Sequence, residues 1–143
     1  MRTPFDTALR MQQRTVDDLK VAIGVSSERI ATLEQQGRDL VERVREERIL
    51  AHALPFASDA WLATAKLAQS RIAEEAEAER ARLVDLREQA REAYGTFRAI
   101  EGAAERFRAD AEREAEAAEQ AAIDDIAAAN FLRQRKRIPV KAA

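Results

Sequence analysis

The apolar residues of positions 2–54 repeat with the period of a coiled coil. Two rows, each spaced by seven residues, carry most of the apolar side chains, and the positions between them are mostly polar. One row is Leu9, Val16, Ile23, Ile30, Gly37, Val44 and Ala51, and the other is Phe5, Gln12, Leu19, Ser26, Leu33, Leu40, Glu47 and Leu54. This pattern predicts one amphipathic helix over about residues 4–54.

A second heptad pattern begins after an interruption at residues 55–58. Pro55 removes a helical hydrogen bond, and Ser58 or Asp59 is a suitable N-cap for a new helix. The new rows are Leu62, Gln69, Ala76, Leu83, Ala90, Phe97, Ala104, Ala111 and Ala118, and Ala65, Ile72, Glu79, Leu86, Ala93, Ile100, Phe107, Glu114 and Ala121. We expect a helix over about 59–137 that tolerates Gly95 and Gly102, followed by a basic, disordered tail at 138–143.

The predicted fold class is all-α, a long antiparallel two-helix coiled-coil hairpin in which helix 2 is longer than helix 1. Residues 1–143 would form a single domain, because a short loop forces consecutive helices to pair antiparallel. Matching polar layers with polar layers favours a register in which opposed residue numbers sum to about 116. It sets Leu33 against Leu83 and Gly37 against Glu79, and it leaves residues 115–137 without a partner helix.

Composition and charge narrow the possible functions. Charged residues make up 35% of the chain and aromatic residues 5%, which is typical of long helices with a thin core. The chain has no cysteine, no apolar signal segment and no apolar run of about 18 residues, so we expect a cytoplasmic protein. Residues 58–129 carry seventeen acids and ten bases, whereas residues 130–143 carry five bases and no acid.

Candidate chemistry is sparse. His52 is the only histidine, and the acidic pairs and clusters, such as Asp124 with Asp125, are expected on solvated helix faces. No nucleophile–base set and no glycine-rich phosphate loop is present, so we expect no enzymatic activity, no cofactor, no metal site and no small-molecule ligand. Trp61 and Phe56 flank the predicted turn, where they would pack on each other or offer an aromatic tip to a partner.

The basic run at 133–137 allows three interpretations. Cations are favourable at a helix C-terminus, and the same bases would also suit an acidic protein partner. Binding to nucleic acid or to a lipid surface is the least favoured of the three, because only Phe131 supplies an aromatic ring nearby.

The segment from Arg91 onward resembles the C-terminal half of FliJ-family proteins, which are stalk components of the flagellar type III export apparatus and are similar to the YscO-type stalk proteins. The family has a Leu-Glu pair, a Glu-Arg pair, Glu-Gln, Leu-Asp-Glu and a basic end. The matching residues here are Ile100-Glu101, Glu105-Arg106, Glu119-Gln120 and Ile123-Asp124-Asp125, with Arg133, Arg135, Lys136 and Arg137 at the basic end. Ala103 or Ala104 replaces a family leucine, and Ala121 or Ala122 replaces a family lysine.

This resemblance implies a non-enzymatic stalk that inserts into the hexameric export ATPase, promotes its assembly and activity, and contacts the export gate membrane protein and substrate chaperones. The protein would be cytoplasmic and peripheral at the flagellar basal body. The contact residues that it implies are Glu101, Glu119, Gln120, Ile123, Asp124, Asp125, Phe131, Arg133, Arg135, Lys136 and Arg137. Two alternatives stay open: a self-associating structural coiled coil, such as a homodimer, and a nucleic-acid or membrane-surface binder that uses the basic tail.

Overall fold

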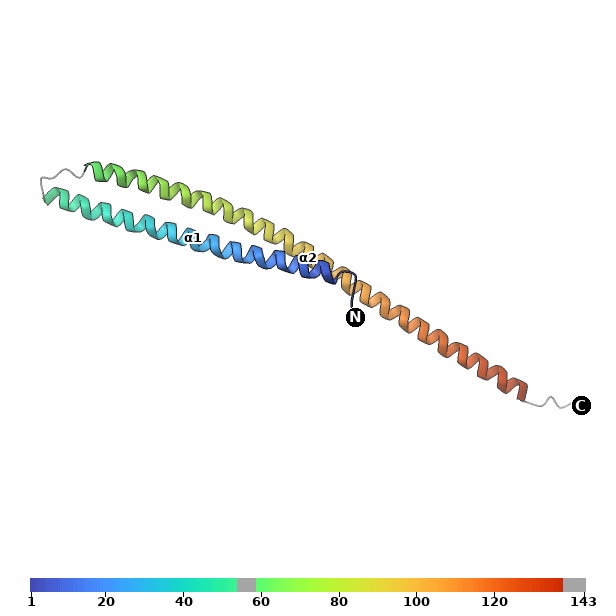
Figure 1. Cartoon of the computed structure of the whole chain (residues 1–143). Coiled ribbons are helices and arrows are strands. Elements are labelled where there is room, and N and C mark those ends of the chain that lie inside the picture. The colour runs from blue at the N-terminus through green and yellow to red at the C-terminus, as the bar shows by residue number, and fades with distance from the viewer. Residues whose placement is uncertain (54–58, 138–143) are drawn as a thin grey trace, which may run out of the picture. The chain divides into compact units, whose positions relative to one another are not determined.

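The computed structural model describes residues 1–53 and 59–137, and all its regular structure is helical. Helix α1 spans Asp6–Ala53 and helix α2 spans Asp59–Arg137. The two run antiparallel as a helical hairpin with α2 the longer, which confirms the predicted fold class (Figure 1). The bounds of α2 coincide with those predicted. Leu54, the predicted turn at 55–58 and the tail at 138–143 lie outside the described residues.

Helix α1 spans residues from Asp6, two residues after the predicted start at about residue 4, and a capping box at Thr3 precedes it. The Thr3 hydroxyl accepts a hydrogen bond from the Phe5 amide at 3.3 Å, and the Thr3 amide donates to Asp6 Oδ2 at 3.2 Å. The Thr3 hydroxyl also donates to Asp6 Oδ1 at 2.6 Å. Pro4 occupies the first position after the cap, where its missing amide hydrogen is not needed. The bonds that Thr3 donates to the Asp6 carboxylate, with the bond that it accepts from the Phe5 amide, therefore fix the start of the helix.

By its internal contacts the chain divides into two units. One unit is Arg10–Phe97, which contains most of α1 and the first half of α2. The other comprises Met1–Leu9 and the chain from Arg98 onward. Helix α2 runs through Gly95 and Gly102 without interruption, so both glycines are tolerated as expected.

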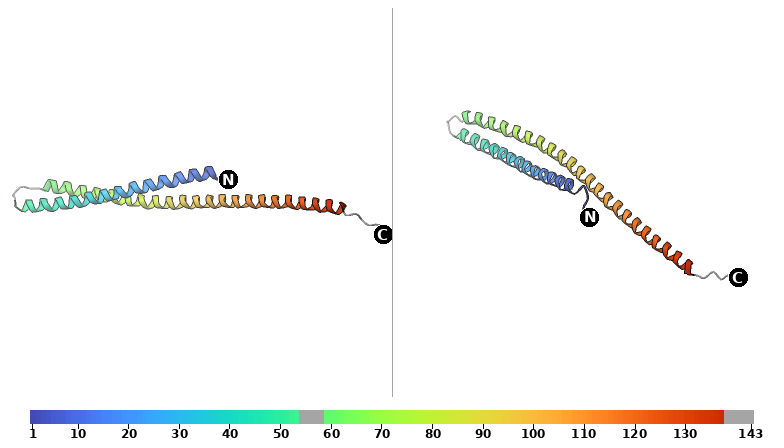
Figure 2. Two further views of the ribbon diagram at one scale, coloured as in Figure 1. Left: turned by 90° about the horizontal axis from the view of Figure 1, so that it is seen from below. Right: turned by 45° about the vertical axis from the view of Figure 1, so that its right-hand side comes forward.

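In the unit of residues 10–97, the predicted heptad rows form the core. Every described residue of the two α1 rows and of the two α2 rows within this unit is buried or half-buried. The most deeply buried side chains are Leu33, at 1% exposed, and Ser26, at 2%. Figure 2 shows the two helices of this unit side by side in both views. The heptad prediction is confirmed here at the level of single residues.

The predicted register of this unit is wrong by one heptad. A Cβ added at Gly37 would lie 3.7 Å from Ile72 Cγ2, so Gly37 faces Ile72 and not Glu79. The Ser26 hydroxyl donates to Glu79 Oε1 at 2.8 Å. Farther along, Gln12 Nε2 donates to the carbonyl oxygen of Ala93 at 2.9 Å. The numbers of Gly37 and Ile72 sum to 109, and both hydrogen bonds lie within about one helical turn of that register.

Close packing explains why this register is adopted. It sets large side chains against small ones, with Leu33 opposite Ala76 and Val16 opposite Ala93, and all four residues are buried. The register expected from the sequence paired large residues with large ones, which would hold the two helices farther apart. The polar residue Glu79 is satisfied by the Ser26 hydroxyl, so it needs no polar layer opposite.

In the unit of residues 1–9 and 98–137, the start of α1 packs on α2 through an aromatic pair. The rings of Phe5 and Phe107 meet edge to face, with centroids 6.4 Å apart and planes at 76°. Ala104 is buried, at 1% exposed, and Ala111 is the last residue of α2 that is half-buried. Every residue from 112 to 137, here called the C-terminal segment, is exposed.

The register can be tested with paired cysteines, since the chain has none of its own. The Gly37→Cys/Ile72→Cys variant should form an intramolecular disulfide under mild oxidation, because these positions face each other. The Gly37→Cys/Glu79→Cys variant should not, because seven residues displace the second thiol by about 10 Å along the helix. Mobility on non-reducing gels and thiol titration measure the outcome. Cross-linking of the second variant alone would restore the register predicted from the sequence.

Candidate partner-binding surface

The residues that the resemblance singles out all lie on α2, in the unit that contains residues 98–137. Glu101 is set apart from the others. It is half-buried and accepts a hydrogen bond from Arg98 Nη1 at 3.0 Å, an ion pair within one helix turn. The remaining ten belong to the C-terminal segment and are exposed: Glu119, Gln120, Ile123, Asp124, Asp125, Phe131, Arg133, Arg135, Lys136 and Arg137. Glu101 is therefore the member least available to a partner.

The first half of the C-terminal segment is acidic. It carries Glu112, Glu114, Glu116, Glu119, Asp124 and Asp125, against one base, Arg113. Arg113 pairs with Asp110 one turn earlier, and Gln120 Nε2 donates to Asp124 Oδ1 at 2.9 Å. These carboxylates are solvated, as expected from the sequence, and together they create a negative potential along this half of the segment.

The second half of the segment is basic. Arg133, Arg135, Lys136 and Arg137 lie within the last five residues of α2, where the helix dipole favours positive charge. Within the described residues none of the four forms an ion pair. Their charge is consequently directed to solvent, and both the helix-terminus role and a partner-binding role fit this placement.

Large apolar side chains interrupt the charged surface of the segment. Ile123 is 51% exposed, Ile126 62% and Phe131 63%, and Leu132 is exposed as well. A single helix of this length has little stability of its own in water, because only packing of an apolar face stabilises most protein helices. Exposed isoleucines on such a helix indicate a surface that packs against another molecule.

Groups suited to metal binding are not assembled in the described residues. His52 is exposed, as predicted, and no group of three or more histidine, cysteine, aspartate or glutamate side chains is arranged to hold a metal ion there. Trp61 is 40% exposed, and its expected neighbour Phe56 lies outside the described residues. None of the described helices has the length and apolar character that a membrane span requires.

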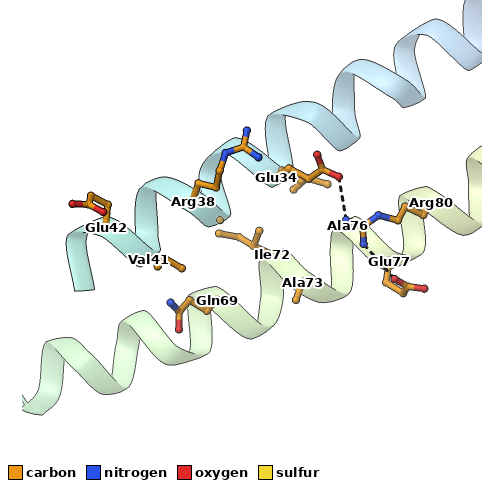
Figure 3. A pocket seen from close by; sticks show the side chains of 12 residues that line it. Glu34, Arg38, Val41, Glu42, Gln69, Ile72, Ala73, Ala76, Glu77 and Arg80 are labelled. Atoms are coloured by element: carbon orange, nitrogen blue, oxygen red, sulfur yellow. Dashed lines mark hydrogen bonds and ion pairs between the residues drawn. The ribbon is translucent and has the colours of Figure 1, made fainter. Parts of the chain in front are cut away.

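A groove of about 780 Å³ lies between the helices in the unit of residues 10–97 (Figure 3). It exists because Gly37, Ala73 and Ala76 leave space beside the larger Leu33 and Ile72. Across one end of the groove, Arg80 Nη2 pairs with Glu34 Oε1 at 3.2 Å, and Arg80 Nη1 pairs with Glu77 Oε2 at 3.3 Å.

These ion pairs affect the pKa of Arg80. The hydrogen bond to Glu34 and, after it, the bond to Glu77 raise the pKa of Arg80 above its usual value, while desolvation opposes them. Arginine is charged at any physiological pH, so the effect of these bonds is to hold the guanidinium at the rim of the groove.

Comparison with known proteins returned no relatives. No protein-family model, no curated protein and no solved structure matches the chain. The fold and its exposed segment define the class of the protein as an antiparallel coiled-coil hairpin.

Two features of the structure, the capping box and the groove, have signals in the sequence that heptad spacing does not reveal. The sequence Thr-Pro-Phe-Asp at residues 3–6 is a capping box with an acidic residue at its fourth position. The groove could have been expected from three small residues, Gly37, Ala73 and Ala76, but only in the register that the structure adopts.

The space beside Gly37 predicts how a side chain added at this position affects stability. The Gly37→Ala variant should unfold at a higher temperature, because alanine favours the helix by about 1 kcal/mol. The added Cβ would also make an ordinary van der Waals contact with Ile72. Thermal unfolding followed by circular dichroism measures this. Gly24→Ala is the matched control, since nothing lies within 4 Å of its Cβ, and it should give the smaller gain. A destabilised Gly37→Ala protein would mean that the helices approach more closely at this point.

Proposed function

We propose that this chain is a non-enzymatic component of the flagellar type III export apparatus, a stalk like those of the FliJ family. In this role it inserts into the ring of the hexameric export ATPase and promotes its assembly and activity. It further contacts the export gate membrane protein and the chaperones that deliver substrates. Its place in the cell is the cytoplasmic side of the flagellar basal body.

The observation that carries this proposal is the exposure of the whole C-terminal segment, residues 112–137. A helix that continues for 26 residues beyond its last half-buried position offers its full circumference to a partner. A central shaft inside a ring of identical subunits needs such a surface, because the ring contacts it from all sides. Of the residues that carry the resemblance, those from Glu119 to the basic end belong to this segment.

The charge pattern supports two separate zones of contact. The acidic zone from Glu112 to Asp125 suits a basic lining, and the basic zone from Arg133 to Arg137 suits an acidic one. Ile123 lies near the end of the acidic zone and Ile126 lies between the two zones, and both supply apolar area that a partner would cover. Charge at both ends with apolar residues between them fixes the direction of insertion, because a reversed helix would meet like charges.

The test is direct binding of the purified chain to the export ATPase of the same bacterium. Reversing the four bases Arg133, Arg135, Lys136 and Arg137 to glutamate should weaken binding at least about ten-fold and reduce stimulation of ATP hydrolysis. Deleting residues 112–143 should abolish both effects. Calorimetry measures the affinity, and phosphate release measures the activity.

A matched control makes the same change of net charge elsewhere. Lys20, Arg43, Arg82 and Arg87 are exposed bases in the unit of residues 10–97, and their reversal to glutamate should leave ATPase binding within about two-fold of wild type. Equal losses in both variants would attribute the effect to net charge alone. A wild-type chain that neither binds nor stimulates the ATPase would refute the stalk proposal.

A further inference from the structure

The C-terminal segment contains a second heptad seam, distinct from the rows that pack within the hairpin. Its members follow one another at alternating intervals of four and three residues, which places them along one stripe of the helix. The seam consists of Glu112, Glu116, Glu119, Ile123, Ile126, Asn130, Arg133 and Arg137. All eight are exposed, and Ile123 and Ile126 lie at its centre.

This seam is self-complementary when two copies are paired antiparallel. If opposed residue numbers sum to 249, Ile123 of one copy faces Ile126 of the other. In the same register Glu119 faces Asn130, Glu116 faces Arg133 and Glu112 faces Arg137. Because the arrangement is two-fold symmetric, each of these layers occurs twice. The centre is apolar, the next layers are polar, where the Asn130 amide can donate a hydrogen bond to the Glu119 carboxylate, and the outer layers join opposite charges.

The positions that flank the seam also permit close approach. One side carries Ala115, Ala122, Ala129 and Lys136, and the other carries Arg113, Gln120, Ala127 and Gln134. In an antiparallel coiled coil each flanking position faces the equivalent flanking position of the other helix. In the hairpin, Arg29 faces Glu75 and Arg80 faces Glu34 in this way. In the middle of the paired segment the flanks therefore bring alanine to alanine and glutamine to glutamine.

A parallel pairing of the same seam is disfavoured by electrostatics. It would set Glu112, Glu116 and Glu119 against their own copies, and Arg133 and Arg137 against theirs. Like charges opposed in a seam cost free energy in each charged layer, whereas the antiparallel register sets Glu112 and Glu116 against arginines. Orientation is thus selected by charge, and the two central isoleucine layers supply the apolar contact.

We propose that residues 112–137 form an antiparallel two-helix coiled coil with the same segment of a second copy of this chain. The paired length is about 39 Å. Two apolar layers among polar ones give a weak and salt-sensitive dimer, which dissociates when another partner covers the segment. This self-pairing does not rest on the proposed stalk function, although it uses the same surface and so competes with ATPase insertion.

The test uses two charge-reversed variants and their mixture. In Glu112→Arg/Glu116→Arg, the outer layers oppose arginine to arginine, and in Arg133→Glu/Arg137→Glu they oppose glutamate to glutamate. Each should raise the dimer dissociation constant at least about ten-fold over wild type in sedimentation equilibrium. An equimolar mixture should recover a dimer mass, because the two variants complement each other at all four outer layers.

The chain that carries all four substitutions is the folding control and the strictest test. It swaps the charges within one molecule, so the antiparallel pairing is complementary again and the homodimer should return. Helix content by circular dichroism should be the same in every variant, since the hairpin core is untouched. The proposal is overturned if wild type remains monomeric throughout the micromolar range. It is equally overturned if the mixture and the four-fold variant stay as monomeric as the two single-sided variants.

These outcomes separate the self-pairing from the stalk proposal. Loss of dimer with normal ATPase binding by the wild-type chain would remove the self-pairing alone. A dimer that responds to the charge swaps, in a chain that does not bind the ATPase, would remove the stalk function alone.

Discussion

The fit of a large side chain against a small one is the constraint on which the hairpin depends. At Gly37 the absence of a side chain leaves space that Ile72 approaches from α2, and a Cβ there would lie 3.7 Å from Ile72 Cγ2. Leu33 against Ala76 repeats the same match one layer away, with both residues buried. A two-helix coil has no other layer to cover its seam, so the register decides how closely the two backbones approach. The groove beside Gly37 is what remains where the small residues on both helices coincide.

The difference in length between the helices then determines which residues of α2 are left for partners. Helix α1 has 48 residues and α2 has 79, so an antiparallel α1 can cover only part of α2. In the unit of residues 1–9 and 98–137, the capping box of Thr3 and Asp6 ends α1 sharply, and Phe5 packs edge to face on Phe107. Burial on α2 ceases after Ala111. Because α1 starts at a defined point and is shorter than α2, the exposed part of α2 also begins at a defined residue.

Much of this architecture could be predicted from the sequence, because heptad spacing is a strong local signal. The core rows, the extent of α2 and the exposure of His52 and the acidic clusters follow from spacing and polarity alone. The register could not be obtained in that way. Two registers one heptad apart place the same rows in contact, and the choice between Glu79 and Ile72 opposite Gly37 depends on how closely the backbones approach. The expectation that polar layers face polar layers also misled at Glu79, because the Ser26 hydroxyl donates a hydrogen bond to this carboxylate without a polar layer opposite. The exposed residues from Glu119 to Arg137 were identified through resemblance, and the spacing alone would not have distinguished them from any solvated helix face.

The composition of the C-terminal segment suits a surface that exchanges partners. A seam of leucines would bind its own copy tightly and would resist displacement, whereas Ile123 and Ile126 provide only two apolar positions among charged ones. Ion pairs between exposed arginine and glutamate contribute little in water, so the charges direct orientation more than they add affinity. Self-pairing would cover the isoleucines while no other partner is present, and a partner with larger apolar area and matching charge would displace the second copy. The separation of charge serves both contacts: acids lie from Glu112 to Asp125 and bases from Arg133 to Arg137. Any partner that binds both zones must present basic residues to the first and acidic residues to the second. The same charge pattern that prevents parallel pairing therefore also restricts the direction in which a different partner can approach.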